Sequence, residues 1–160
     1  MEGIRLLVLD VDGVLTDGRI YMDDQGKETK AYHVRDGYGI RLLMGAGIDV
    51  AIITGRLSKS AGHRAADLGI KNIFQGVSDK KAVCMKLLEE KGLAMDQVCF
   101  IGDDLQDLSL LKVVGLPVTV SDAVREVREV ARYITEKNGG CGAVREVCEL
   151  ILKAQNAWGL

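Results

Sequence analysis

Four short runs of consecutive apolar residues predict the strands of a buried sheet. A strand that is apolar at every position is covered on both faces, which is typical of a parallel sheet between two layers of helices. The four runs are residues 6–9, 50–53, 98–101 and 116–120.

The segments between these runs carry apolar residues at helical spacing and begin near residues that commonly cap helices. Strands that alternate with helices imply right-handed crossovers. The predicted fold class is therefore α/β, a three-layer α/β/α sandwich around a parallel sheet. The expected helices follow Asp36 as N-cap, run from Ser58 to Leu68, follow Ser78 as far as Gly92, follow Asp104, follow Ser121, and run from about Ala143 to Gln155 with Val144, Val147, Leu150 and Ile151 facing inward.

Residues 19–33 break this alternation and predict a β-hairpin extension. Two strands of mixed polarity flank Asp23-Asp24-Gln25-Gly26, which is a strong turn signal. An isolated hairpin is only marginally stable in water, so this one must pack against something, and another subunit is one candidate. The chain shows no internal repeat or linker, so residues 1–160 are expected to form a single domain.

Composition narrows the class of protein. The chain has 160 residues, of which 48% are apolar, and this is enough for a sizeable core. A net charge of −2 argues against a nucleic-acid partner, and no apolar run is long enough to predict a membrane span. The first residues enter a strand without the pattern of a signal peptide, so we expect a cytoplasmic location.

The four cysteines predict neither a zinc site nor disulfides. None of them forms a C-x-x-C pair, and without a secretion signal the thiols are expected to stay reduced. Cys84 and Cys99 lie in apolar segments and are expected in the core. Cys141 lies in a glycine-rich loop, where we expect an exposed but unreactive thiol.

Candidate chemistry begins where the first predicted strand ends. Asp10 and Asp12 follow that strand, and ligands of open parallel sheets bind beyond the carboxyl ends of the strands. Residues two apart lie on the same side of an extended chain, so the two carboxylates repel each other unless a cation lies between them. Taken alone, a D-x-D pair is more simply explained as a solvated acidic turn.

Polar residues also follow the second predicted strand and open a later helix. Thr54, Gly55 and Arg56 offer a hydroxyl, a free backbone N–H and a guanidinium, which together suit a phosphate. Lys80 or Lys81 lies at the start of a helix, where an ordinary solvated lysine is the simpler explanation.

An acidic cluster follows the third predicted strand. Asp103, Asp104 and Asp107 repel one another unless a cation compensates, although Asp104 has a simpler role as a helix cap. Chance explains each of the four groups separately. Their occurrence in order, each at a strand end or a helix start, favours a single active site.

With these four groups the chain resembles the haloacid dehalogenase superfamily over nearly its whole length. The motifs of that family are a D-x-D pair, a strand that ends in Ser or Thr, a lysine, and an acidic G-D-D-x-x-D segment. They are matched by Asp10-Val11-Asp12, Thr54, Lys80 as the better of the two lysines, and Gly102, Asp103, Asp104 and Asp107.

The resemblance implies a magnesium-dependent phosphomonoesterase that works through an aspartyl-phosphate. Asp10 would be the nucleophile, and Asp12 would protonate the leaving oxygen and later activate water. Mg²⁺ would be bound by the Asp10 carboxylate, the Asp12 backbone carbonyl and Asp103. Thr54 and Lys80 would stabilise the charge on the phosphoryl oxygens.

Two further roles are implied around this site. Asp104 and Asp107 would orient the waters of the metal and Lys80. The aspartate at position 12 favours a phosphatase over a dehalogenase, because only the phosphatase needs this acid and base.

Finer motifs resemble the capless, homotetrameric branch of the family that hydrolyses 3-deoxy-D-manno-octulosonate 8-phosphate, a precursor in lipopolysaccharide biosynthesis. Predicted elements fill the intervals between the motifs, so no cap domain is expected. In this branch the hairpin assembles the tetramer and reaches over a neighbour's site. The finer motifs are residues 13–18, 33–40, 53–56 and 139–146.

The resemblance implies a phosphorylated sugar acid as the substrate. Arg56, beside Gly55, is the candidate group for the substrate carboxylate, because a planar guanidinium binds carboxylates well, and Arg64 would assist. A solvated surface arginine is the ordinary alternative for Arg56. Related enzymes act on sialic-acid-type substrates, so a nonulosonate 9-phosphate is the alternative substrate.

Two non-catalytic classes of protein share parts of this motif set. A phosphoacceptor receiver domain also combines acidic residues, a Thr or Ser and a Lys around Mg²⁺, but its acceptor Asp ends a middle strand, where this chain has Thr54. A relative that only binds partners is expected to lack part of the motif set, and all four motifs are intact here. A phosphate-release assay with Mg²⁺ separates both classes from the enzyme.

Overall fold

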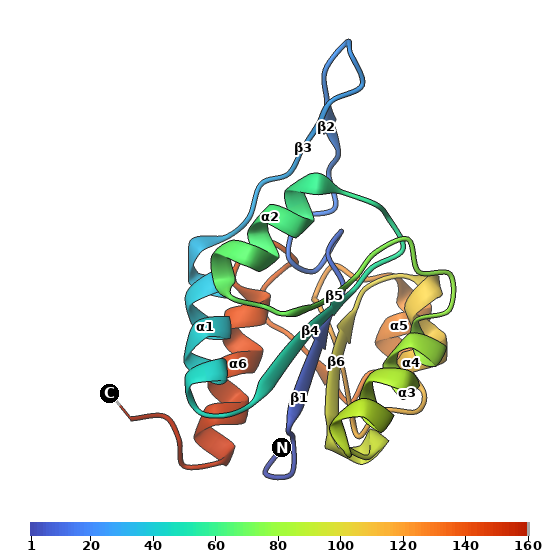
Figure 1. Cartoon of the computed structure of the whole chain (residues 1–160). Coiled ribbons are helices and arrows are strands. Elements are labelled where there is room, and N and C mark those ends of the chain that lie inside the picture. The colour runs from blue at the N-terminus through green and yellow to red at the C-terminus, as the bar shows by residue number, and fades with distance from the viewer. Residues whose placement is uncertain (160) are drawn as a thin grey trace.

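A six-stranded sheet forms the centre of the structure, a computed structural model that describes residues 1–159 (Figure 1). Its strands are β1 (Leu6–Leu9), β4 (Asp49–Ile53), β5 (Asn72–Phe74), β6 (Val98–Gly102), β7 (Leu116–Thr119) and β8 (Tyr133–Ile134). Neighbouring strands are parallel, in the order β5-β4-β1-β6-β7-β8. Every residue of β1, β6 and β7 is buried, which accounts for their continuous apolar sequence.

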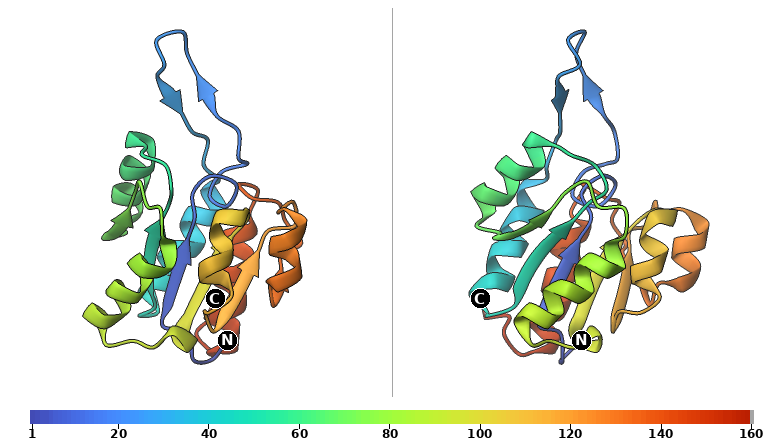
Figure 2. Two further views of the ribbon diagram at one scale, coloured as in Figure 1. Left: turned by 90° about the vertical axis from the view of Figure 1, so that its right-hand side faces the viewer. Right: turned by 45° about the vertical axis from the view of Figure 1, so that its right-hand side comes forward.

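Helices cover both faces of the sheet, so the three-layer prediction is confirmed (Figures 1 and 2). One layer contains α1 (Val34–Gly45), α2 (Lys59–Leu68) and α6 (Ala143–Ala154). The other contains α3 (Lys80–Lys91), α4 (Leu108–Leu111) and α5 (Arg125–Val130). The short 3-10 turns η1 (Met95–Gln97) and η2 (Leu105–Asp107) precede β6 and α4.

The order of the strands creates a switch point between β1 and β6. From β1 the chain moves outward through β4 to β5, then returns to β6 on the other side of β1 and continues to β8. The connections on the two sides of this point therefore leave in opposite directions, which opens a crevice beyond the carboxyl ends of the strands. Asp10 and Asp103 follow the two strands that flank it.

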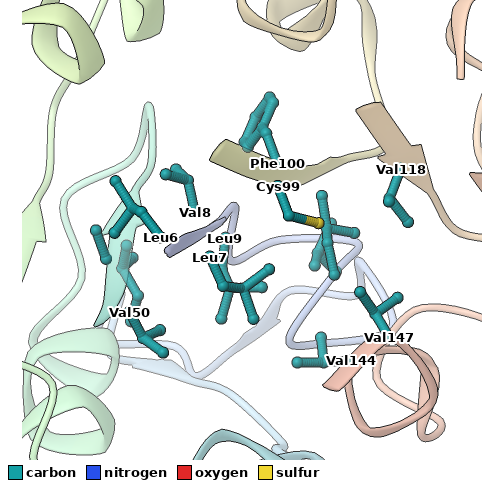
Figure 3. Packing of buried hydrophobic residues seen from close by; sticks show 14 of the residues in the cluster. Leu6, Leu7, Val8, Leu9, Val50, Cys99, Phe100, Val118, Val144 and Val147 are labelled. Atoms are coloured by element: carbon teal, nitrogen blue, oxygen red, sulfur yellow. The ribbon is translucent and has the colours of Figure 1, made fainter. Parts of the chain in front are cut away.

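The core lies on both faces of β1. Figure 3 shows Leu7, Leu9 and Cys99 on the side of the sheet that faces α6, whereas Val8 and Phe100 point toward the other layer. Leu7 pairs with Cys99 and Val8 with Phe100, so neighbouring strands place the same faces together. Each fully buried large apolar side chain contributes roughly 1.5–3 kcal/mol, and this packing fixes the ends of the strands where the site forms.

Several predicted helix termini are confirmed. Ser58 is the N-cap of α2, where its hydroxyl accepts a hydrogen bond from the Ala61 backbone N–H, and Gly69 ends that helix in the left-handed conformation. Gly92 ends α3 in the same way. The start of α3 differs by one residue from the prediction, because Asp79 rather than Ser78 is its N-cap.

Asp36 is not the N-cap of α1, so that prediction was wrong. The helix begins at Val34, and Asp36 lies buried in its first turn. Asp36 Oδ1 instead accepts a hydrogen bond of 2.8 Å from the backbone N–H of Arg145, in the first turn of α6. The carboxylate therefore caps a different helix, a long-range pairing that the local pattern does not encode.

Two other details differ from the pattern. Helix α5 follows Val124 rather than Ser121, so its first turn starts three residues later than the sequence pattern predicts. In α6, Leu150 is only half-buried, and the buried face is completed by Cys148 and Leu152. The remaining predicted core residues of α6, Val144, Val147 and Ile151, are buried.

The predicted hairpin is present and extends beyond the carboxyl end of the sheet (Figures 1 and 2). Its strands β2 (Tyr21–Met22) and β3 (Glu28–Thr29) are antiparallel and flank a turn in which Gly26 adopts a positive φ. Within the described residues, the hairpin and α1 occupy the interval between β1 and β4, and α2 and β5 occupy the next one. These elements leave no room for a cap domain.

The burial of Cys84, Cys99 and Cys141 agrees with the prediction from the sequence. Cys84, Cys99 and Cys148 are buried free thiols, and Cys141 is an exposed free thiol. Among residues 1–159, none of the helices has the length and apolar character needed to cross a membrane.

Candidate active site

Asp10 is held at the carboxyl end of β1, in the middle of the sheet. Its backbone N–H donates to the Ile101 carbonyl (3.1 Å), and its Oδ1 accepts from the Val11 N–H (2.7 Å). The residue is 1% exposed. Burial raises the pKa of its carboxyl group, and the positive charge of Lys80 opposes that shift. Asp10 is thus a rigid carboxylate that depends on nearby cations for its charge.

Lys80 supplies one such positive charge from the first residue of α3. Its Nζ lies 2.9 Å from Asp10 Oδ2 and 2.6 Å from Asp107 Oδ1, and the residue is 2% exposed. Burial acts to lower the pKa of Lys80, but the two carboxylates outweigh it and raise the pKa above its usual value. Lys81, the other candidate from the sequence, is half-buried; Lys80 is the lysine that the fold brings to Asp10.

Asp107 braces this arrangement. Its Oδ2 accepts hydrogen bonds from the backbone N–H groups of Asp103 (2.9 Å) and Asp104 (3.2 Å), while its Oδ1 bonds to Lys80. Gly102 permits the approach, since a Cβ there would lie 2.6 Å from the Asp107 side chain. Asp104 itself is exposed and accepts from the Leu105 N–H, so the contact with Lys80 is made by Asp107.

Three carboxylates in this region are close enough to share a cation. Asp10, Asp103 and Asp107 each offer an oxygen, and these oxygens lie within 4.8 Å of one another. Both oxygens of Asp107 take part in hydrogen bonds, whereas Asp10 Oδ2 and Asp103 Oδ1 are buried and accept none among the described residues, so Asp10 and Asp103 are the better ligands.

The charge of Asp103 is the strongest sign that a cation belongs here. Burial, together with the charges of Asp10, Asp107 and Asp104, raises the pKa of Asp103 to about 8. Gly13 closes the space above it with a φ of +86°, and a Cβ at Gly13 would lie 1.9 Å from Asp103 Oδ2. A divalent cation with oxygen ligands fits this donor set, since it would remove the repulsion that the three carboxylates impose.

Thr54 and Gly55 take the expected place at the end of β4. Thr54 is 2% exposed, and its backbone bonds to Phe74 and Val77 on the neighbouring segment. Gly55 lies close to Gln106, whose Oε1 would be 3.0 Å from a Cβ at that position. The loop after β4 is thereby held against the turn that follows β6.

A second ion-pair group, which we call the Lys30 cluster, contains Asp12, Glu28, Lys30 and Arg56. Lys30 Nζ bonds to Asp12 Oδ1 and lies 3.1 Å from Glu28 Oε1. Arg56 Nη2 lies 2.5 Å from Glu28 Oε2, and Arg56 Nε lies 3.6 Å from Asp12 Oδ2. Burial acts to raise the pKa of Glu28, but hydrogen bonds from Arg56 and Lys30 outweigh it and lower the pKa.

Sequence reasoning missed Lys30 and Glu28. Both lie in a hairpin arm of mixed polarity, where charged residues are usually solvated. One signal was available: residues 28 and 30 are two apart and therefore project to the same side of an extended chain. What the pattern did not show is that this side faces Asp12.

The structure does not bring Arg64 into either group. Arg64 Nη1 lies 2.8 Å from Asp67 Oδ2, its Nη2 donates to the His33 carbonyl, and its guanidinium stacks over Tyr32. Arg64 is therefore occupied at the face between α1 and α2 within this chain. His63 is exposed on α2, as expected for a solvated residue.

The arrangement suits transfer of a phosphoryl group to a carboxylate. A buried carboxylate, a buried ammonium and a pair of carboxylates that could hold a cation lie together at the switch point of the sheet. Cations that neutralise the nucleophile and the phosphate allow two anionic groups to meet. A second carboxylate, that of Asp12, lies two residues from Asp10, where it can exchange protons with the ester oxygen of a bound phosphate.

Comparisons with known proteins place the chain in a family. The model of the haloacid dehalogenase-like hydrolase family matches residues 70–147. The 3-deoxy-D-manno-octulosonate 8-phosphate phosphatase of Escherichia coli K12 is 52% identical over 154 residues, which is 96% of this chain and 82% of that protein. The chain therefore belongs to the haloacid dehalogenase-like hydrolases, in the branch that contains the 3-deoxy-D-manno-octulosonate 8-phosphate phosphatases.

Two similar solved structures are of relatives that contain bound groups. The Moraxella catarrhalis 3-deoxy-D-manno-octulosonate 8-phosphate phosphatase, in complex with a magnesium ion, a phosphate ion and a KDO molecule, is 47% identical with a TM-score of 0.95. The match covers 97% of this chain and 89% of that chain. The cobalt-bound enzyme of Haemophilus influenzae is 42% identical with a TM-score of 0.94, over 97% of this chain and 91% of that chain.

Proposed function

We propose that this chain is a Mg²⁺-dependent phosphatase that hydrolyses 3-deoxy-D-manno-octulosonate 8-phosphate. The observation that carries the proposal is the buried group around Asp10, where Lys80 and the cation-binding carboxylates surround one rigid nucleophile. The sugar acid comes from the relatives, of which one is known with magnesium, phosphate and KDO bound. A non-catalytic receiver module would carry its acceptor Asp at the end of a middle strand, where this chain has Thr54.

The reaction uses this chain's residues in two steps. In the first, Asp10 attacks phosphorus, the bond from phosphorus to the sugar oxygen breaks, and Asp12 gives its proton to that oxygen. In the second, Asp12 takes a proton from water, which attacks phosphorus and frees Asp10 and phosphate. Thr54 and Lys80 hold the phosphoryl oxygens, where charge accumulates.

Magnesium completes the site. Asp10, Asp103 and the backbone carbonyl of Asp12 would hold the ion, with Asp107 fixing the loop that carries Asp103. When bound, the ion supplies positive charge that lets the anionic nucleophile and the anionic phosphate meet. Asp104, which is exposed beside this loop, would orient waters of the ion.

Substrate selection is assigned to Arg56, with Gly55 offering its backbone N–H to the phosphate. The Arg56 side chain is 46% exposed and lies beside Asp12, so it faces the substrate side of the site. A substrate carboxylate would take the place of Glu28 on the guanidinium, as a bidentate partner. Arg64 is occupied in this chain, so its assistance would need a neighbouring subunit or a rearrangement.

A substrate panel tests the proposed function. With Mg²⁺, the protein is expected to release phosphate from 3-deoxy-D-manno-octulosonate 8-phosphate with a kcat/KM well above that for a nonulosonate 9-phosphate or for an aryl phosphate. A chelator should abolish release, and added Mg²⁺ should restore it. Preference for the nonulosonate would establish the alternative substrate. No turnover of any phosphate would leave only a binding module.

We also infer a homotetramer in the cytoplasm. On the hairpin, Ile20 and Tyr21 are each 46% exposed and Met22 is 60% exposed, although this element has no core of its own. Burial between subunits would stabilise these side chains and place the hairpin over a neighbour's site. The free thiols are in keeping with a reducing compartment. If light scattering finds a monomer, and that monomer is fully active in the phosphate-release assay, the inferred assembly is contradicted.

A further inference from the structure

Lys30 is an unusual residue for the segment that carries it. It lies between β3 and α1, on a hairpin arm whose other side chains are mostly exposed, yet its own side chain is 0% exposed. Burying an ammonium costs several kcal/mol unless charged partners satisfy it. Lys30 meets this condition through only two carboxylates among the described residues, those of Asp12 and Glu28.

These contacts fix the direction of the Asp12 side chain. Its Oδ1 bonds to Lys30, and its Oδ2 lies 3.6 Å from Arg56 Nε. The Lys30 contact is direct and partly buried, whereas Arg56 is half-exposed and can turn to a substrate carboxylate. Of the two cations beside Asp12, Lys30 is therefore the more buried and makes the shorter contact. Asp12, in turn, is only 19% exposed, so it has little room to reorient.

We propose that Lys30 is a positioning residue for Asp12, and that the hairpin arm thereby sets up the proton transfer in its own subunit. The inference rests on the proposed phosphatase activity. Lys30 does not contact the phosphate, which Lys80 and Thr54 bind in the proposed mechanism. It acts through Asp12, by keeping one carboxylate oxygen bonded so that the other faces the leaving oxygen. The hairpin then has a task inside the subunit besides assembly.

The proton transfer in question can be isolated chemically. As the Asp10–phosphorus bond forms and the bond to the leaving oxygen breaks, the Asp12 proton moves to that oxygen, and the alcohol departs neutral. A leaving group that is stable as an anion does not need this proton. Phenol has a pKa near that of tyrosine, about 10, and alkyl alcohols are much more basic, whereas p-nitrophenol is far more acidic than phenol.

The experiment measures kcat/KM of the full-length protein with Mg²⁺ for ethyl, phenyl and p-nitrophenyl phosphate. This ratio covers only the steps through release of the alcohol, so the later hydrolysis of the aspartyl-phosphate does not enter. None of the three substrates has a carboxylate, so binding to Arg56 does not enter either. The variants are Lys30→Met, which keeps the length of the stem but removes the charge, and Lys27→Met as a matched control on the exposed side of the hairpin.

For Lys30→Met we expect kcat/KM to fall about tenfold to a hundredfold for ethyl and phenyl phosphate, because a misplaced acid loses part of its effect. For p-nitrophenyl phosphate the loss should stay under about threefold. Lys27→Met should match the wild type on all three substrates. Lys30→Arg keeps the charge and should recover part of the loss with the basic leaving groups.

Three results decide the matter. An equal loss on all three substrates by a folded Lys30→Met protein, or no loss on any, would overturn the role of Lys30. If Lys30→Met does not fold, Lys30→Gln is the second variant, since its amide keeps one hydrogen bond to Asp12, and the same leaving-group dependence is expected at smaller size. A wild-type protein that hydrolyses no phosphate would refute the proposed function itself, which is a separate outcome.

Discussion

Two buried lysines, Lys80 and Lys30, are each paired with two carboxylates, but they belong to different parts of the molecule. Lys80 starts a helix that packs on the sheet, and its partners Asp10 and Asp107 are both buried. The partners of Lys30 are partly exposed, and both of them also form ion pairs with Arg56, which is half-exposed. Burial on all sides restrains the side chains around Lys80. The side chains around Lys30 are partly open to solvent, where the substrate beyond its phosphate would bind.

The difference separates two tasks. In the proposed mechanism, the inner group, formed by Asp10, Lys80 and Asp107, would hold the nucleophile and the positive charge that acts on every phosphate ester. The Lys30 cluster would hold the acid and bind the rest of the substrate. Changes in the inner group should therefore affect all substrates alike, and changes in the outer one should depend on the leaving group or on the carboxylate.

The largest effect is expected for Asp10→Asn. The amide neither attacks phosphorus nor binds a cation well, so turnover should fall roughly 10⁴- to 10⁶-fold on every substrate. The fold should persist, because the amide is nearly isosteric and relieves repulsion. The matched control is Asp96→Asn, an exposed residue in η1 at the opposite end of the sheet, which should leave kcat unchanged. Steady-state turnover by a verified Asp10→Asn protein would refute the nucleophile.

The next effect is that of Lys80→Met. Loss of a preorganised charge on the phosphoryl oxygens should lower kcat by about 10²–10³-fold, equally for the sugar acid and for p-nitrophenyl phosphate. The neighbouring Lys81→Met is the control on the same helix and should change kcat little. A loss confined to one substrate would mean that Lys80 is not part of a general phosphate site.

Arg56→Ala should give a smaller and selective loss. A charge-assisted contact with the substrate carboxylate contributes roughly 1.5–3 kcal/mol, which corresponds to about tenfold to a hundredfold in kcat/KM for the sugar acid phosphate. Hydrolysis of p-nitrophenyl phosphate should be nearly unchanged. The matched control is Arg19→Ala, at an exposed position of the hairpin, which should leave kcat/KM unchanged for both substrates. Equal losses on both substrates would assign Arg56 to the phosphate or to the fold.

The smallest effect concerns stability without metal. The pKa of Asp103 is about 8 in the fold, above its value of 3.8 in an unfolded chain, so its charged form is disfavoured in the folded state. The resulting destabilisation is absent below pH 3.8, grows as the pH rises, and is complete above pH 8. In chelator at pH 8.5, Asp103→Asn should therefore melt above the wild type, by about 2–4 °C for each kcal/mol of destabilisation that the substitution removes.

Magnesium provides the complementary measurement. At pH 8.5, Mg²⁺ should raise the melting temperature of the wild type, since binding to the folded state alone stabilises it, and should raise that of Asp103→Asn much less. A wild-type melting temperature that does not change when Mg²⁺ is added would contradict the cation site at Asp10 and Asp103.

Most of the sheet and the inner group could be predicted from the sequence, because both rest on local signals. Strands buried on both faces are apolar at every position, and the residues of the inner group directly follow such strands or open a helix. Parallel strands then bring their carboxyl ends to one edge, so Asp10, Thr54 and Asp103 gather there whatever the details of the loops.

The rest depends on contacts between distant segments. Asp36 caps α6 rather than its own helix, because the folded chain brings the Arg145 N–H to it. Strand β8 has only two residues, too few for a pattern. Lys30 and Glu28 look like solvated hairpin charges until the arm folds back over Asp12. In each case the sequence shows the residue type but not the partner.

In the proposed mechanism the phosphoryl group passes through Asp10, and trapping the aspartyl-phosphate tests this most directly. The protein with Mg²⁺ is mixed with 3-deoxy-D-manno-octulosonate 8-phosphate, quenched in acid at times within one turnover, and reduced with borohydride, which converts an aspartyl-phosphate to homoserine. Peptide mass spectrometry should then find homoserine at position 10, and none in the Asp10→Asn protein. Stoichiometric release of phosphate with no modification of Asp10 at any time, or with modification of a different residue, would contradict the account.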